Sequence, residues 1–184
     1  DIEPGGTTPF TNSYYFYKAI VADEMHIEKW AEHYFRRIDR ENFSKYLFWS
    51  ALRSYGKGDF KAAEELLKKI LNQKLSETDA AFAKKVARTL ARVYFQNQEY
   101  EKSLGFYTSF LLKVNPVSTG DWLEAAWNYY YLKQYDRALG FVYNLESRYL
   151  DGPVLLEKYV LRALIYRNSC ETEKMESLLE SFDE

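Results

Sequence analysis

The feature that most constrains the fold of this chain is a helix-pair pattern that recurs along it. In residues 119–142, apolar residues recur at spacings of three and four, the period of an amphipathic helix. The pattern consists of Trp122, Ala125, Ala126 and Tyr129 on a first helix and Ala138 and Val142 on a second. A tight turn is predicted at Lys133-Gln134-Tyr135 between them. Because Ala126 and Ala138 are small, the two helices are expected to approach each other closely.

Three further copies of these six positions are present. One copy has Leu47, Ser50, Ala51, Ser54, Ala63 and Leu67; another has Ala87, Leu90, Ala91, Tyr94, Ser103 and Tyr107; the last has Tyr159, Arg162, Ala163, Tyr166, Met175 and Leu179. In every copy the fourth and fifth positions are nine residues apart, and the copies start 40, 35 and 37 residues apart. Such a regular spacing predicts stacked helix pairs with one continuous core.

This pattern resembles the tetratricopeptide repeat family, whose motif is W-x2-L-G-x2-Y…A-x3-F…P with a period near 34. The resemblance covers residues 44–184, and its most specific parts are GDFKAAEELL, QEYEKSLGFY and QYDRALGFV. Ser50 and Arg162 depart from the motif by replacing its leucine, and Met175 replaces its small residue. Residues 13–43 are interpreted as a degenerate fifth copy, with Ala19 and Ala31 at the small positions.

The resemblance implies an all-α fold, a right-handed α-solenoid of antiparallel helix pairs in a TPR-like superhelix. We expect a flexible leader or linker over 1–12 and a single helical-repeat domain over 13–184. This domain is expected to contain the degenerate pair 13–43 and the repeats 44–78, 79–118, 119–153 and 154–184. The alternative is a generic helical bundle whose spacing is accidental.

Several local signals predict where helices begin and which way they face. Ser13 and Ser44 are expected to cap the helices that follow them, and residues 76–79 resemble a capping box. A helix is predicted over 27–39. Its inward residues are expected to be Trp30, Ala31, Tyr34, Phe35 and Ile38.

Composition and charge exclude several classes of protein. The 184 residues carry a net charge of −2, so bulk charge does not favour binding to nucleic acid. No apolar run approaches the roughly 18 to 20 residues that cross a bilayer, and no signal peptide is present. We therefore expect a soluble chain without a membrane span or a targeting segment, and the compartment stays unknown. The chain does not begin with Met, which indicates a trimmed or processed product.

No motif in the sequence supports catalysis or a bound cofactor. His26 and His33 are seven residues apart, but two ligands do not close a zinc site, so both are interpreted as surface or partly packed histidines. Cys170 has no basic neighbours that would lower a thiol pKa, and it is interpreted as structural. GKGD lacks the spacing of a phosphate-binding loop. We predict no catalytic residue, no metal site and no cofactor.

The resemblance implies a binding surface, because the first helices of tetratricopeptide-like solenoids line a concave face that holds a peptide or a partner helix. The corresponding residues lie about 100° around each first helix from the core stripe. They are Lys45, Phe48, Leu52 and Tyr55; Lys85, Arg88, Arg92 and Phe95; Leu123, Trp127, Tyr130 and Tyr131; and Val160, Leu164 and Arg167.

These residues predict a groove with aromatic walls and a basic centre. Arg88 and Arg92 are expected to bind a carboxylate, and Trp127 and Tyr130 to hold an apolar or proline side chain. We therefore expect a non-catalytic interaction module or scaffold whose protein or peptide partner has an acidic and an aromatic or proline-containing segment. Two alternatives stay open. In one, the basic residues form only a solvated helix face and the aromatic residues pack on the neighbouring repeat. In the other, the chain is a regulatory domain of a larger protein or enzyme complex whose active part lies outside this chain.

Overall fold

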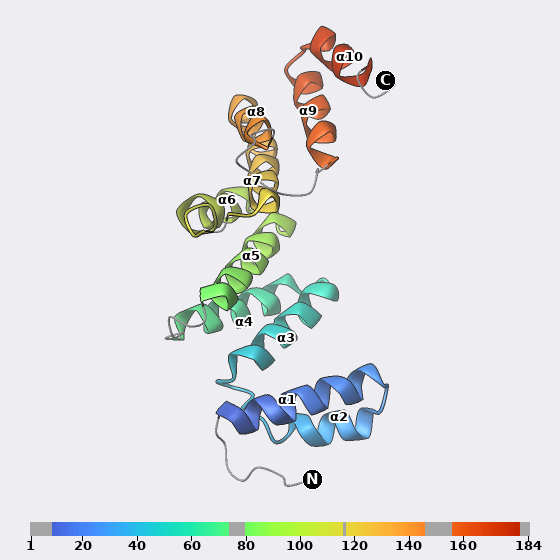
Figure 1. Cartoon of the computed structure of the whole chain (residues 1–184), viewed down its shortest axis with the longest axis vertical. Helices are drawn as coiled ribbons and strands as arrows, with labels where there is room; N and C mark the ends of the chain where they lie inside the picture. Colours follow the sequence, from blue (N-terminus) through green and yellow to red (C-terminus); the bar gives the residue numbers. More distant parts are fainter. Residues whose placement is uncertain (1–8, 74–79, 116, 146–155, 181–184) are drawn as a thin grey trace. The chain divides into compact units, whose positions relative to one another are not determined.

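The computed structural model describes residues 9–73, 80–115, 117–145 and 156–180. These residues form ten α-helices and one π-helical segment, and no strand occurs among them (Figure 1). The chain divides into two compact units, Asp1–Lys74 and Leu75–Glu184, called unit 1 and unit 2 below. The single repeat domain over 13–184 stays a prediction.

Unit 1 consists of two helix pairs. The helices are α1 (Pro9–Glu24), α2 (Glu28–Phe35), α3 (Ser44–Gly56) and α4 (Phe60–Asn72). Ala19 and Ala31 are both buried where α1 and α2 pack together, as predicted for small positions. The pair contacts α3 through aromatic rings, with the Phe35 and Trp49 centroids 4.7 Å apart.

Unit 2 contains three helix pairs. The elements are α5 (Ala80–Gln96), α6 (Tyr100–Phe106), the π-helical segment η2 (Tyr107–Leu111), α7 (Thr119–Tyr131), α8 (Tyr135–Asn144), α9 (Glu157–Asn168) and α10 (Thr172–Glu180). The η2 turn continues α6 with a wider hydrogen-bond ring, in which the Leu112 amide donates to the Tyr107 carbonyl at 3.0 Å. Tyr107 and Leu111 are both buried, so this wider turn keeps two large side chains in the core.

The five turns inside the helix pairs have the same conformation. Each has one residue with φ between 58° and 78°, and these residues are His26, Gly58, Gln98, Lys133 and Cys170. In each turn the next amide bonds a carbonyl five residues back at 2.9 Å, as when Gln134 N–H donates to Tyr129. This is the Schellman arrangement that ends a helix. Its recurrence at His26 shows that the degenerate first pair follows the same register as the other four.

Most of the small repeat positions form the core, whereas several of the others, such as Ser54, Trp122 and Ala163, are half-buried. Ala51, Ala63, Ala91, Ala126, Ala138 and Ser103 are buried. In the last copy the prediction for Leu179 was wrong, because it is 51% exposed whereas Leu178 is buried. This copy also has Arg162 and Met175 at positions that usually hold leucine and a small residue, so its second helix packs one residue out of register.

The predicted helix starts need correction at the N-terminal end. The first helix begins at Pro9, four residues before the expected cap Ser13, and Asn12 is buried where its Oδ1 accepts a bond from Asp39 N–H at 3.0 Å. Ser44 does not cap α3; its hydroxyl donates to Gln73 Oε1 at 2.5 Å. Residues 76–79, the expected capping box, lie outside the described residues.

The inward orientation predicted for Trp30 was wrong. Ala31, Phe35 and Ile38 are buried and Tyr34 is half-buried, but Trp30 is 53% exposed. Trp30 immediately precedes Ala31, so on an α-helix the two side chains point about 100° apart and Trp30 falls outside the buried stripe. No helix among the described residues is long and apolar enough to span a membrane.

Candidate partner-binding surface

The first helices of unit 2 are joined by side chains that lie 30 to 38 residues apart in the sequence. From α5, Arg88 reaches Asp121 at the start of α7 through two bonds, Nε to Oδ1 at 2.5 Å and Nη2 to Oδ2 at 2.8 Å. Asp121 is fully buried. The hydrogen bonds to Asp121 raise the pKa of the Arg88 guanidinium, which keeps it charged.

The second arginine of α5 makes a more exposed pair. Arg92 donates to Glu124 of α7, with Nη2 to Oε1 at 2.5 Å and Nε to Oε2 at 3.0 Å. The buried hydroxyl of Tyr107 donates to the same carboxylate. Burial, followed by the charge of Glu124, raises the pKa of Tyr107 well above its usual value, so this hydroxyl remains a donor.

Between α7 and α9, two polar contacts join the first helices. Trp127 Nε1 donates to Glu157 Oε1 at 2.7 Å, and Asn168 Nδ2 donates to the Tyr130 hydroxyl at 2.8 Å. Because its indole N–H is already bonded, Trp127 offers mainly its ring to a ligand. These contacts give the predicted residues a structural role in joining neighbouring pairs.

Five rings gather on this side of unit 2 and are called the aromatic cluster: Phe95, Tyr100, Trp127, Tyr130 and Tyr131. Tyr131 lies at its centre, with ring centroids 4.8 Å from Tyr100, 5.4 Å from Phe95 and 6.1 Å from Trp127. The Tyr100 and Tyr131 rings are nearly parallel, at 9°. Burial and the neighbouring Tyr131 raise the pKa of Tyr100.

The structure therefore brings four predicted residues together in this cluster, namely Phe95, Trp127, Tyr130 and Tyr131. It is a half-buried surface, in which Tyr131 is 46% exposed and the other four rings are partly covered. Leu123, predicted on the same helix face, is instead buried against Leu161 and Ile165 in the core of unit 2. On α9, Val160 and Arg167 are exposed and Leu164 is half-buried.

The predicted residues of unit 1 form a separate set. Phe48 is buried, Leu52 is 42% exposed, and the Tyr55 ring lies 5.6 Å from Phe60. Lys45 lies over the Tyr17 ring, 5.5 Å from its centroid. These residues belong to a different compact unit from the aromatic cluster, and the proposal below uses unit 2 alone.

Sequence reasoning missed four members of this surface: Tyr100, Asp121, Glu124 and Glu157. Tyr100 begins the second helix of its pair, and only first helices were considered. A usable signal existed for the carboxylates, because each lies 30 to 33 residues after its partner, close to one repeat period. An arginine or tryptophan on one first helix therefore predicts an acidic residue about one repeat period later, on the next first helix.

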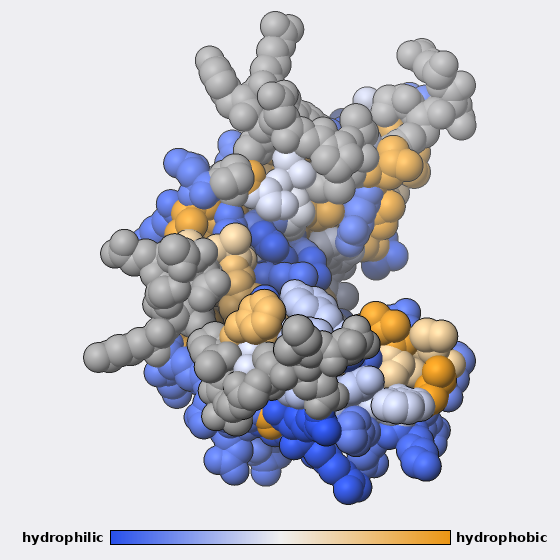
Figure 2. All heavy atoms as spheres, turned by 60° about the horizontal axis from the view of Figure 1, so that its bottom comes forward, coloured by the Kyte–Doolittle hydropathy of each residue, from blue (hydrophilic) through white to orange (hydrophobic). Residues whose placement is uncertain are grey.

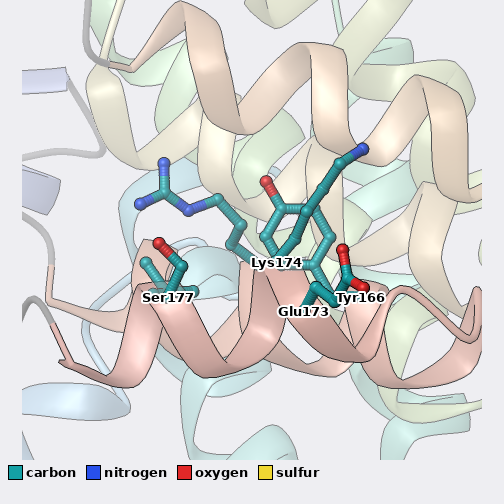
Figure 3. Close-up of a pocket in the computed structure, with 6 residues that line it drawn as sticks. Tyr166, Glu173, Lys174 and Ser177 are labelled. Carbon is teal, nitrogen blue, oxygen red and sulfur yellow. The ribbon is translucent and has the colours of Figure 1, made fainter.

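Two of the cavities in unit 2 adjoin α5 and α9. One of about 410 Å³ adjoins Arg88 between the start of α5 and the loop before α7, and its walls are mainly apolar. The other, about 450 Å³, lies at α9 and α10; Figure 3 shows Tyr166 of α9 beside Glu173, Lys174 and Ser177 of α10. Two of its polar groups bond within the chain: Tyr166 hydrogen-bonds the Tyr143 hydroxyl at 2.8 Å, and Lys174 pairs with Glu171.

The described residues contain no candidate metal site. Across these parts of the chain, no group of three or more His, Cys, Asp or Glu side chains is placed to hold a metal ion. His26 and His33 are both exposed, and Cys170 lies on the exposed turn before α10.

No protein-family model matches the sequence, and no curated protein matches it. Solved structures are similar. Two structures of MamA from AMB-1 superpose with TM-scores of 0.63 and 0.65 at 18% identity, covering 92% and 94% of this chain and 95% and 90% of theirs. PilF of Pseudomonas aeruginosa superposes with a TM-score of 0.61 at 17% identity, covering 87% of this chain and 69% of its own.

MamA and PilF are tetratricopeptide-repeat proteins. At this level of identity the likeness concerns the fold, and it agrees with the repeated turns and small core positions of this chain. The predicted all-α class of helical solenoid is confirmed. The chain therefore has the fold of the tetratricopeptide-type helical repeats.

Proposed function

We propose that this protein is a non-catalytic interaction module that holds an extended segment of a partner protein against the aromatic cluster of unit 2. The observation that carries the proposal is the placement of five aromatic rings on one side of the α5–α7 region, with Tyr131 at their centre and 46% exposed. Aromatic residues with partly exposed rings are the commonest anchors of protein interfaces. The tetratricopeptide-type fold supports the same proposal.

The chemistry of the surface suggests which segment it holds. Because the Trp127 N–H and the Tyr130 hydroxyl already have partners, the cluster presents ring faces, which suit a proline or aromatic side chain. Arg92 lies three residues before Phe95 on α5 and supplies positive charge near the rings, and Lys85 lies two turns before Arg92 on the same helix. An acidic residue of the partner would form an ion pair with Arg92, which already pairs with Glu124.

A peptide-library selection tests this proposal. Peptides selected on the wild-type protein are expected to contain a proline or aromatic residue close to an acidic residue. Tyr131→Ser is expected to weaken their binding by about tenfold or more, the size of an interface anchor. Tyr143→Ser is the matched control, because Tyr143 is also a tyrosine with 46% exposure but lies on α8. Equal binding by the two variants would refute the assignment.

A further inference from the structure

At its α9 side, the aromatic cluster meets a carboxylate that forms no ion pair among the described residues. Glu157, in the first turn of α9, is exposed, and its Oε1 accepts the bond from Trp127 Nε1 at 2.7 Å. Within the described parts of the chain, this is the only bond of the Glu157 side chain. Exposed polar residues are ordinary on this protein, since Figure 2 shows hydrophilic residues over much of the face that it draws. Glu157 differs from most of them because it is held at the edge of an aromatic ring.

Glu157 belongs to a stripe of α9 that faces α7. At 100° per residue, four residues fall within about 80° of one another around α9: Glu157, Val160, Leu164 and Asn168. The first bonds Trp127, and the last donates to the Tyr130 hydroxyl at 2.8 Å. Between these two bonds, Val160 is 56% exposed and Leu164 is half-buried. The stripe therefore extends the aromatic cluster with apolar side chains and ends in a carboxylate.

The basic residues of α9 do not neutralise this carboxylate. Lys158 is buried, and its Nζ lies 4.8 Å from the centroid of the Tyr159 ring. The Arg162 guanidinium lies 5.4 Å from the centroid of the same ring. Arg167 is ten residues after Glu157, which is about 15 Å along the helix axis. The N-terminus of α9 carries roughly half a positive charge and so offsets only part of the charge of Glu157.

The charged residues of α7 do not neutralise it either. Asp121 and Glu124 are acidic, and they pair with the two arginines of α5. Lys133 follows in the turn after α7, six residues beyond Trp127. The group that complements this end of the aromatic cluster is therefore positively charged.

A lysine or arginine side chain can interact with the carboxylate and with the ring together. A carboxylate has about four acceptor positions, and the indole N–H uses one of them. Tryptophan is also the aromatic side chain that attracts a cation over its face most strongly. Trp127 is half-buried, so part of its ring is open to solvent. A cation over this ring lies beside Glu157, because the carboxylate bonds the edge of the same ring.

We propose that Glu157 and the ring of Trp127 bind a lysine or arginine side chain of the partner segment. This inference rests on the proposed function and extends it, because it adds a basic residue to the segment on the side that meets α9. The acidic residue proposed to pair with Arg92 meets α5, on the other side of α7. The two charges therefore give the segment one direction across unit 2.

A peptide library with a fixed Asp-Pro-Tyr core between two randomised flanks tests this inference. On the wild-type protein, lysine and arginine are expected to be enriched over aspartate and glutamate in one flank. E157Q should lose this enrichment, because glutamine keeps an acceptor for the Trp127 N–H but carries no charge. E157K should enrich acidic residues in the same flank. Acidic enrichment or no preference in the wild type, or an unchanged preference in E157Q, would overturn the inference.

Two synthetic peptides from the selection, with lysine or glutamate at the enriched position, give the size of the effect. We expect the wild type to bind the lysine peptide about fivefold more tightly in fluorescence anisotropy, and E157Q to bind the two peptides within about twofold of each other. E176Q is the matched control, because Glu176 is also exposed and its replacement changes the net charge equally, but it lies on α10. An equal loss of preference in E176Q would assign the effect to bulk charge and overturn the inference.

Tyr131→Ser separates this inference from the proposed function, and circular dichroism verifies that each variant is folded. Tyr131→Ser should weaken the binding of both peptides and keep their ratio. If it bound both as the wild type does while E157Q lost the preference, the Tyr131 anchor would be refuted and the Glu157 site would stand. If Tyr131→Ser weakened both peptides while E157Q kept the preference, the Glu157 site alone would be refuted.

Discussion

Arg88 and Arg92 lie one helical turn apart on α5, yet their surroundings differ. Arg88 neutralises Asp121, which is fully buried, whereas the Arg92 side chain is half exposed and pairs with a partly exposed Glu124. The chemistry expected from the sequence, arginine binding a carboxylate, is present within the chain itself. Replacing Arg88 would therefore change folding as well as binding.

We expect Arg88→Ala to lower the free energy of unfolding by about 3 kcal/mol or more, because it leaves a buried carboxylate without its charge partner. Arg92→Ala should cost about 1 kcal/mol or less, as is usual for an exposed ion pair. Urea unfolding followed by circular dichroism measures both values. Similar losses in the two variants would contradict this difference in burial.

Tyr107 gives an expectation about pH. Its pKa is raised above the usual value of 10.0 by burial and by Glu124, so the folded state retains the proton longer than the unfolded state. Its stabilising contribution is complete below pH 10 and is lost as the pH rises further. Above about pH 10, the wild-type free energy of unfolding should fall more steeply than that of Tyr107→Phe, by about 1.4 kcal/mol per pH unit.

Urea unfolding at about pH 9, 10.5 and 11 gives the slopes for both proteins. Tyr17→Phe serves as the control for the loss of a tyrosine hydroxyl at an exposed position. Identical slopes for wild type and Tyr107→Phe would show that the Tyr107 hydroxyl does not titrate differently in the folded state.

At the scale of elements, the turn inside each helix pair is the most regular feature. All five turns use a left-handed residue, but only one, Gly58, is a glycine. We expect Gly58→Ala to destabilise the protein by about 1 kcal/mol and Lys133→Gly to stabilise it by about 0.5 to 1 kcal/mol. Gly56→Ala is a control for the first change, because Gly56 is helical and a Cβ there meets no atom within 4 Å.

Thermal unfolding of the three variants measures these effects. Gly56→Ala should stabilise slightly, since alanine is the better helix former. If Gly56→Ala lost as much stability as Gly58→Ala, the added methyl group, and not the left-handed backbone, would cause the destabilisation.

The helix pairs could be predicted from the sequence because small and bulky residues recur at a fixed spacing. The first pair is harder to recognise because it has Ala22 where three of the other four copies have tyrosine, although its turn at His26 follows the common pattern. Trp30 is exposed, and Leu178 is buried in place of Leu179. Both outcomes depend on how a short helix is rotated about its axis by one residue, and the spacing of apolar residues in the sequence does not determine that rotation.

The candidate site was only partly predictable for a different reason. A first-helix residue can contact either a ligand or the next first helix, and the sequence pattern is the same in both cases. Arg88 pairs with Asp121 of the next first helix, and Leu123 is buried in the core. Tyr131, by contrast, is exposed at the surface. Its cluster with Tyr100 requires the turn before α6 to bring the second helix beside α7, which depends on tertiary packing.

At the scale of the whole molecule, two units of the same repeat present different surfaces. Unit 1 exposes the large apolar side chains Val21, Met25 and Trp30 on its first helix pair, and unit 2 has the aromatic cluster. Both surfaces are formed by residues that the repeat core does not need. Because the proposed partner surface lies in unit 2 alone, Val21→Ser with Trp30→Ser in unit 1 should leave partner capture intact.

The most direct test of the central proposal is site-specific photo-crosslinking with benzoylphenylalanine placed at 131 or at 143. The two positions are equally exposed tyrosines, so differences in crosslinking report location and not accessibility. We expect the probe at 131 to crosslink an extended partner segment in an extract of the source cells, with competition by the library-selected peptide, and the probe at 143 to give none. Equal crosslinking at both positions, or crosslinks at 131 that the peptide does not displace, would contradict the account.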